Sequence, residues 1–178
     1  MKALSRGRRL ALAMLSLTCA AVLFHTNVAT ALVSRGDDLL AAGDVNGAAR
    51  VYGRAFRLDA ANADAADRLA FALLLRRAPG DAARADAVAV AGLAAAPHDA
   101  RLLADRGFAA QRLRRWRDAE AAFLGAALVG RDPRYAHLAA QMARRCADRA
   151  AERMHLRTAL ALDRRYAPAR MLLARWNR

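Results

Sequence analysis

The sequence predicts an all-α protein built from helix pairs that stack side by side. The chain of 178 residues holds 50 alanines and 26 leucines, but no isoleucine and only eight valines. Alanine and leucine have high helix propensities, whereas strands favour β-branched residues. A second observation is an internal repeat of about 34 residues, which is typical of helical arrays whose units bury their apolar faces against one another.

The first element is an apolar N-terminal segment that we interpret as an export signal or a membrane anchor. Four basic residues among the first nine precede the run LALAMLSLTCAAVLF, residues 10–24, which carries no charge. This order, followed by Ala29 and Ala31 in an A-x-A arrangement, matches a cleavable signal peptide. The uncharged stretch 10–34 is also long enough to cross a bilayer as a helix, so an uncleaved anchor is the alternative.

Both interpretations divide the chain into a signal peptide or signal anchor, residues 1–31, and a repeat domain, residues 32–178. Positive charges before the apolar run keep the N-terminus in the cytoplasm, which places the repeat domain in the periplasm. An anchor formed by residues 10–33 would hold the domain at the inner membrane. Cys146 is the only cysteine of this domain, so the sequence predicts no disulfide within it.

Inside the repeat domain, two segments align with an offset of 71 residues. The alignment places Gly36 over Gly107 and Tyr52 over Phe123. A middle copy has Ala70 in the place of the glycine, lacks the aromatic residue, and carries three extra residues in its loop. Further matched pairs are Val45 with Trp116, Ala48 with Ala119, and Ala55 with Ala126.

This pattern resembles the tetratricopeptide repeat (TPR) family. Its 34-residue units place small residues at positions 8, 20 and 27 and an aromatic residue at position 24. The resemblance implies an all-α, right-handed α-α superhelix, a TPR solenoid of about four helix pairs with a C-terminal capping helix. Small residues are needed because the two helices of a unit cross closely. The expected units are residues 29–62, 63–99, 100–132 and 133–166, with the cap at 167–176.

Helix ends are marked by turn residues and prolines. Gly43 and Asp44 mark a turn within a unit, whereas Pro97 and Pro133 lie between units, and Pro168 suits the first turn of a last helix. We expect helices at 30–42, 45–58, 62–77, 81–95, 99–113, 116–129, 134–147, 149–162 and 167–176.

The fourth unit fits the pattern least well. Placing Ala159 at position 27 puts Glu152 where an alanine is expected. Counting forward from Pro133 instead shifts the first helix of the unit by three residues. The sequence leaves both registers open.

The resemblance implies a concave groove lined by the first helix of each unit. Its predicted surface runs from acidic residues, including Asp37, Asp64 and Asp67, through aromatic residues to arginines. Apolar anchors and Arg–carboxylate pairs could hold an extended peptide or a partner helix there. The alternative is that the phenylalanines pack between helices and the arginines are solvated. The residues predicted to bind a partner are Phe71, Phe108, Gln111, Arg112 and Arg144.

Several catalytic classes lack their reacting group. After residue 34 the chain has no serine, no lysine and one threonine, which excludes a serine hydrolase, a P-loop and a Schiff-base lysine. His98, His137 and His155 form no i,i+4 pair and have no CxxC beside them, so no metal site is expected. We therefore predict no catalytic residue and no cofactor.

These observations predict a non-catalytic scaffold in the bacterial cell envelope that binds a peptide or protein in its groove. The expected partner is a component of a secretion, pilus, exopolysaccharide or cytochrome maturation assembly. The alternative is a cytoplasmic protein that binds nucleic acid or an acidic partner through its net charge of +14. The cluster Arg114–Arg117 would serve that alternative, but its Trp116 also stands at position 17, where the repeat uses a structural aromatic.

Overall fold

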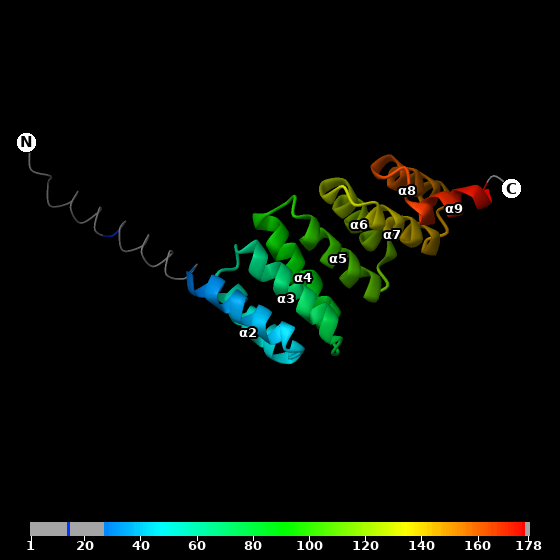
Figure 1. The fold of residues 1–178 in the computed structure, drawn as a ribbon. Coiled ribbons are helices and arrows are strands. Elements are labelled where there is room, and N and C mark those ends of the chain that lie inside the picture. Colours follow the sequence, from blue (N-terminus) through cyan, green and yellow to red (C-terminus); the bar gives the residue numbers. More distant parts are fainter. Residues whose placement is uncertain (1–13, 15–26, 177–178) are drawn as a thin grey trace, which may run out of the picture.

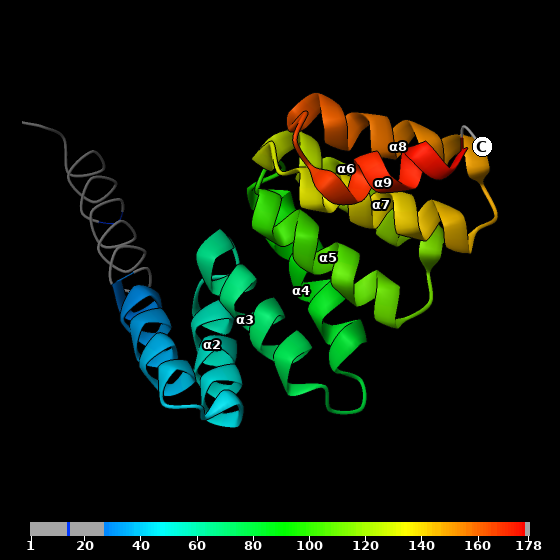
Figure 2. The same ribbon diagram turned by 45° about the vertical axis from the view of Figure 1, so that its right-hand side comes forward.

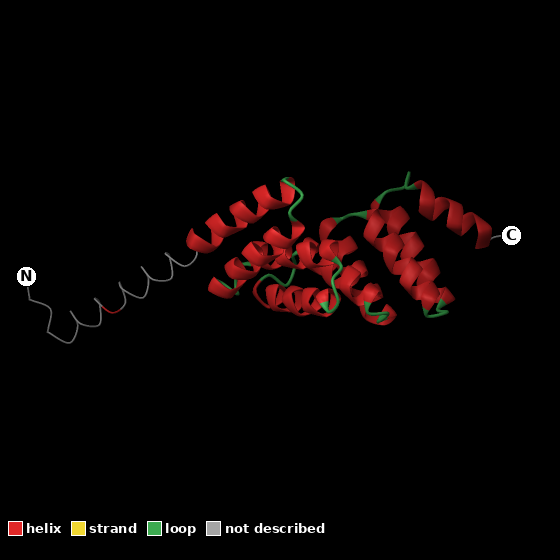
Figure 3. Cartoon of the chain, turned by 90° about the horizontal axis from the view of Figure 1, so that it is seen from below, coloured by secondary structure: helices red, strands yellow, loops and turns green. Residues whose placement is uncertain are grey.

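The computed structural model describes residue 14 and residues 27–176, and every regular element in this part of the chain is a helix (Figure 3). A helical segment at 27–41 comes first. The predicted apolar run 10–24 lies outside the described residues, except for Met14. Eight helices follow: α2 (Val45–Leu58), α3 (Ala63–Arg76), α4 (Asp81–Ala95), α5 (Ala100–Arg112), α6 (Trp116–Gly130), α7 (Pro133–Arg145), α8 (Arg149–Leu162) and α9 (Ala167–Trp176).

The helices stack in sequence order from one end of the molecule to the other (Figure 1). Each helix from α2 to α9 packs on its neighbours in the sequence, and α3 also packs on α5, the first helix of the next pair. The predicted all-α solenoid of helix pairs is therefore confirmed. None of the described helices has both the length and the hydropathy needed to cross a bilayer.

Side-chain caps set the starts of five helices. Asp44, Asn62, Asp99, Asp132 and Asp148 each accept a hydrogen bond from a backbone N–H in the first turn of the helix that follows. These bonds satisfy donors that have no partner within the helix. Because capping depends on neighbouring residues only, the starts of these five helices differ from the predicted ones by no more than one residue. The bounds of α2–α9 as a whole differ from the predicted ones by no more than two residues.

The packing and bounds of α7 and α8 can be compared with the two registers of the fourth unit. Ala159 and Leu156 are fully buried at positions 27 and 24, and Ala140 is buried at position 8. Glu152 occupies the alanine position and is also buried. Ala140 is the eighth residue of α7, as Gly107 is of α5, so the helix bounds agree with the register counted back from Ala159.

The last helix closes the apolar end of the array. Leu172 and Leu173 of α9 pack on a cluster that includes Ala136 of α7 and Leu156 of α8. Figure 2 shows α9 lying along α7 and α8. A terminal helix of this kind shields the face that a further repeat would otherwise cover. This arrangement agrees with the predicted capping helix.

Candidate partner-binding groove

A pocket of about 410 Å³ lies on the face formed by α3 and α5, and Tyr135 of α7 borders it. Its lining residues recur at intervals of three and four, because those intervals bring side chains to one face of a helix. We call this pocket the central pocket. It is lined by Asp67, Arg68, Phe71, Leu74, Leu75, Arg77, Arg101, Ala104, Asp105, Phe108, Arg112 and Tyr135.

The structure brings three of the five predicted binding residues together. Phe71, Phe108 and Arg112 all line the central pocket. Gln111 lines an adjacent hollow that shares Phe108 and Arg112 with it. Arg144 lies apart from them, in a hollow at the C-terminal end that also includes Trp176.

The two phenylalanines differ in how they meet the core. Phe71 is 46% exposed and Phe108 is 37% exposed, so each offers apolar surface to the pocket. Phe108 also packs edge-on against the buried ring of Phe123, with the ring centroids 5.0 Å apart. Phe108 therefore does both things that were expected from the sequence. One part of its ring faces the groove, and another part packs between helices.

Arg112 has an internal partner. Its Nη1 donates a hydrogen bond to the backbone carbonyl oxygen of Leu74, in the last turn of α3. Carbonyls at this end of a helix lack intrahelical donors, so the guanidinium satisfies one of them. Burial, together with the nearby charge of Arg77, lowers the pKa of Arg112.

Acidic residues gather around Arg101 at the other end of the central pocket. The Arg101 guanidinium nitrogens lie 3.4 Å from carboxylate oxygens of Asp64 and Asp99, and 3.3 Å from Asp67. Burial raises the pKa of Asp67, and the positive charge of Arg101 opposes this effect. The predicted acidic end of the groove is thus present on α3 and at the start of α5.

Sequence reasoning missed Asp105. It lies one turn after Arg101 on α5 and lines the central pocket, but only 6% of it is exposed. Burial, and next the charge of Asp67, raises the pKa of Asp105 to about 8. The spacing of four residues from Arg101 was the only available signal, and an aspartate beside an arginine on a helix is usually a solvated pair.

Asp37, predicted to belong to the acidic end, is held by neighbours inside the array. It accepts a hydrogen bond of 2.6 Å from the Tyr52 hydroxyl and lies 3.4 Å from Nε of Arg68. Burial, followed by the hydrogen bond to Asp37, raises the pKa of Tyr52. These contacts join the helical segment 27–41 to α2 and α3.

The basic cluster around Trp116 is largely occupied by internal contacts. Trp116 packs against a core cluster that includes Phe123, and the Arg145 guanidinium lies 5.7 Å from the centre of its ring. Arg115 pairs with Asp86, and Arg117 lies 3.0 Å from Asp148. Such pairing reduces the free positive charge that a nucleic-acid surface requires.

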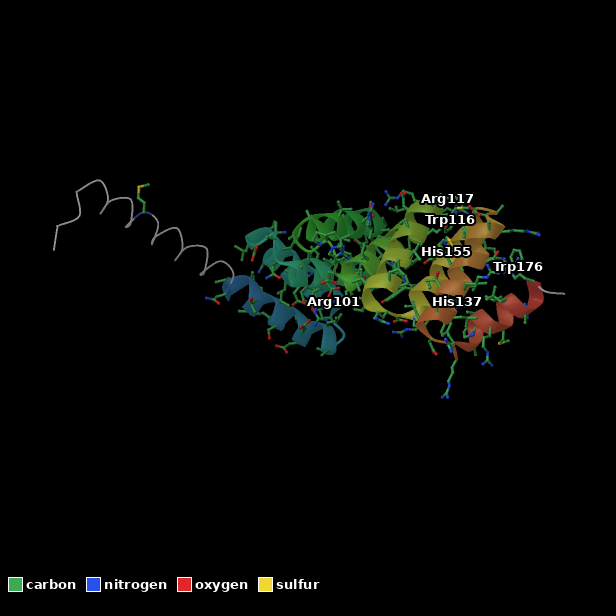
Figure 4. All side chains as sticks on the ribbon, turned by 90° about the horizontal axis from the view of Figure 1, so that it is seen from above. Arg101, Trp116, Arg117, His137, His155 and Trp176 are labelled. Carbon is green, nitrogen blue, oxygen red and sulfur yellow. The ribbon has the colours of Figure 1, made fainter. Side chains whose placement is uncertain are left out.

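His155 and His137 serve as links between helices. On α8, the buried His155 lies 2.9 Å from Glu120 of α6, and Glu120 also lies 3.3 Å from Arg117; Figure 4 labels His155 and Arg117. His137 lies 3.1 Å from the Tyr166 hydroxyl, and burial lowers its pKa. Among the described residues, no group of acidic, histidine and cysteine side chains is placed to hold a metal ion.

Comparisons with known proteins identify the fold. No protein-family model and no curated protein sequence matches the chain. A structure of MamA from Desulfovibrio magneticus RS-1 superposes with a TM-score of 0.66 at 24% identity, over 79% of this chain and 78% of that one. This chain has the TPR fold. At this level of identity, the TPR likeness defines the architecture alone.

Two further structures show the same TPR architecture. PilF of Pseudomonas aeruginosa matches with a TM-score of 0.62 at 20% identity, over 82% of this chain and 65% of that one. The first TPR of Spaghetti (RPAP3), bound to the HSP90 peptide SRMEEVD, matches with a TM-score of 0.64 at 15% identity, over 68% of this chain and 95% of that one.

Proposed function

We propose that this protein is a non-catalytic scaffold whose central pocket binds a peptide segment of a partner protein. The observation that carries the proposal is the exposed pair Phe71 and Phe108, which lies in a 410 Å³ pocket on the face shared by α3 and α5. Exposed aromatic residues in a pocket, rimmed by charged groups, are the usual anchors of protein interfaces.

The bound peptide of RPAP3 supports peptide recognition on this fold, but not the same ligand. TPR clamps for chaperone tails use a lysine and an asparagine at positions 5 and 9 of one unit. Val33 and Asp37 occupy these positions in the first unit. Because Asp37 is already bound to Tyr52 and Arg68, we propose a partner other than a chaperone tail.

We further propose that the scaffold works in the cell envelope, either in the periplasm or anchored to the inner membrane and facing it. The basic start and the apolar run 10–24 support this location. Its partner would then be a component of an envelope assembly. An export-reporter fusion to residues 1–35 tests the location, and a reporter active only in the cytoplasm would contradict it.

The binding proposal is tested by capture of partners from the envelope fraction. We expect Phe71→Ala to reduce capture, because it removes apolar surface from the pocket. The matched control is Leu128→Ala, since Leu128 is an exposed apolar residue of α6 that does not line the central pocket. Equal capture by both variants and the unchanged protein would contradict the proposal.

The cytoplasmic nucleic-acid alternative makes a different prediction. Binding through the net charge would fall steeply with salt and would not depend on Phe71. The pairing of Arg115 and Arg117 with carboxylates favours the peptide-binding scaffold over this alternative.

A further inference from the structure

Around Arg101, at one end of the central pocket, carboxyl groups of the pocket lining and of its surroundings outnumber the cations. Asp64, Asp67 and Asp99 share the single guanidinium of Arg101, each at 3.3 to 3.4 Å. Asp105 of the same pocket adds a fourth carboxyl group, and its charge interacts with those of Asp67, Arg101 and Asp99. Arg101 is therefore shared by four acidic side chains, and a second positive charge, that of Arg68, acts on Asp67.

Two charged residues of the pocket have a buried polar atom without a hydrogen-bond partner, Asp105 at Oδ2 and Arg68 at Nε, and Asp105 is the acidic one. Its Oδ2 is inaccessible to solvent and forms no hydrogen bond within the described chain. Nε of Arg68 has an ion pair instead, 3.4 Å from a carboxylate oxygen of Asp37, and Arg112 donates a hydrogen bond to the carbonyl of Leu74. A buried polar atom without a partner carries a desolvation cost, and a ligand that donates to the small exposed part of this carboxyl group would offset it.

The pocket also offers apolar surface near this group. Phe108 lies one turn after Ala104 and Asp105 on α5, and Phe71 lies one turn after Asp67 on α3. All five residues line the central pocket. A bound peptide that places a cationic side chain at Asp105 can therefore pack an adjacent apolar side chain on the rings of Phe71 and Phe108.

We propose that the central pocket recognises a lysine or arginine side chain of the partner peptide, which binds Asp105 and Asp67 while an adjacent apolar residue packs on Phe71 and Phe108. This inference rests on the proposed peptide-binding function and names the chemistry of the residue that the pocket selects. The charge-assisted hydrogen bond that such a side chain donates to a carboxylate is among the stronger polar contacts in proteins.

The protonation of Asp105 links this binding to pH. Because its pKa is raised to about 8, Asp105 holds a proton at neutral pH in the free protein. A bound ammonium or guanidinium group favours the carboxylate, so binding releases that proton to solvent. Affinity should therefore rise with pH up to about 8 and then level off.

The charged and titratable groups around Asp105 are consistent with this exchange. Asp67 of α3 raises the pKa of Asp105, Arg101 of its own helix lowers it, and the capping residue Asp99 raises it. Tyr135 of α7 borders the same pocket, and the charge of Asp105 contributes to raising the pKa of Tyr135. On the other sides of α5, Asp86 of α4 and Asp118 of α6 both pair with Arg115.

The test selects displayed peptides of about ten residues on the full chain. Four libraries carry lysine, arginine, glutamate or the uncharged norleucine at the central position, with all other positions random. We expect the lysine and arginine libraries to be enriched on the unchanged protein and on Asp118→Asn, whose carboxylate is about half exposed. We expect Asp105→Asn to lose that enrichment, because it removes the charge and keeps the shape.

Calorimetry on the strongest lysine peptide tests the inference in the unchanged protein, so the result stands even if Asp105→Asn does not fold. We expect affinity to increase about 20-fold from pH 6.5 to pH 8.5, with release of close to one proton at pH 6.5. Enrichment of glutamate or norleucine peptides, or an affinity that does not rise with pH, would overturn the inference and leave the proposed function intact. If no library were enriched more on the unchanged protein than on a Phe71→Ala/Phe108→Ala variant, both this inference and the proposed peptide-binding function would be overturned.

Discussion

The backbone of Gly107 lies directly against the ring of Phe123. A Cβ atom placed on Gly107 would come within 2.6 Å of two ring carbons, closer than packed atoms approach. Phe123 in turn contacts Phe108 edge-on, with centroids 5.0 Å apart, and stacks on Tyr135 at 6.5 Å. The glycine therefore sets the position of a core ring on which two residues of the central pocket rest.

The contact between a small residue and an aromatic ring differs from unit to unit. In the first unit the ring of Tyr52 lies against Gly36. In the second unit, alanine stands at both positions, as Ala70 and Ala89, and both are fully buried. Loss of the aromatic residue in this unit thus accompanies gain of a methyl group at the position of the glycine.

Gly107→Ala should destabilise the protein by about 1–3 kcal/mol, because the added methyl group overpacks the contact with Phe123. Urea unfolding followed by circular dichroism measures the change. Gly125→Ala is the matched control: its Cβ would lie 3.5 Å from the nearest atom of Leu103, which is ordinary contact. Since alanine favours a helix interior over glycine, we expect this control to gain about 0.5–1 kcal/mol. Equal effects of the two substitutions would contradict the role assigned to Gly107.

The raised pKa of Asp105 predicts a pH dependence of stability with a defined sign. The folded protein keeps a proton up to about pH 8 that the unfolded chain loses near pH 4. The folded state therefore binds more protons between these values, and the contribution of Asp105 to stability falls as pH rises, by at most about 1.4 kcal/mol per pH unit. Urea midpoints at pH 4.5, 6.0 and 7.5 should show a smaller fall in Asp105→Asn than in the unchanged protein. If the urea midpoints of Asp105→Asn and of the unchanged protein fell equally with pH, the raised pKa assigned to Asp105 would be refuted.

Asp81 should stabilise the inserted loop of the second unit. It is fully buried, accepts a bond of 2.8 Å from Nε of Arg76, and accepts another of 2.9 Å from the backbone N–H of Ala78. We expect Asp81→Ala to cost about 2–4 kcal/mol, because it leaves these donors without an acceptor. The exposed Asp118→Ala should change stability by less than about 0.5 kcal/mol.

The pH dependence of the Asp81 contribution has the opposite sign to that of Asp105. The hydrogen bond from Arg76 lowers the pKa of Asp81 below its usual value. Its contribution is therefore present above about pH 4 and is lost as pH falls through the lowered pKa. Urea unfolding at pH 3 and pH 6 should show a larger gap between Asp81→Ala and the unchanged protein at pH 6.

Arg112 and Arg144 should differ in their effects on stability. Arg112→Ala removes a donor from the Leu74 carbonyl and should cost about 1 kcal/mol. Arg144 is exposed at the other end of the array, so Arg144→Ala should stay within about 0.5 kcal/mol. Thermal unfolding of both variants checks this difference. Should Arg112→Ala leave stability unchanged while partner capture falls, Arg112 would be a binding residue without a structural role.

The predicted elements agree with the structure because their signals are local. Asp99 and Asp132 cap the helices that begin at the next residue, and the contact of Gly107 with Phe123 joins residues only 16 apart in one unit. The groove positions of Phe71 and Phe108 follow from helical spacing for the same reason. The central pocket could therefore be predicted in part.

The contacts that decide the remaining roles join different units. Arg112 reaches the carbonyl of Leu74 across 38 residues of chain, and the burial of Asp105 depends on how α5 packs against α3. Helical periodicity predicts the face of the helix on which a side chain lies. It does not predict which group of the neighbouring helix pair that side chain contacts. The sequence alone therefore determined the helices, their caps and the repeat. Only the tertiary structure decided the buried state of Asp105, the internal partner of Arg112 and the separation of Arg144 from the pocket. The physical reason is that packing between helix pairs sets both the local dielectric around a side chain and the groups available to bind it.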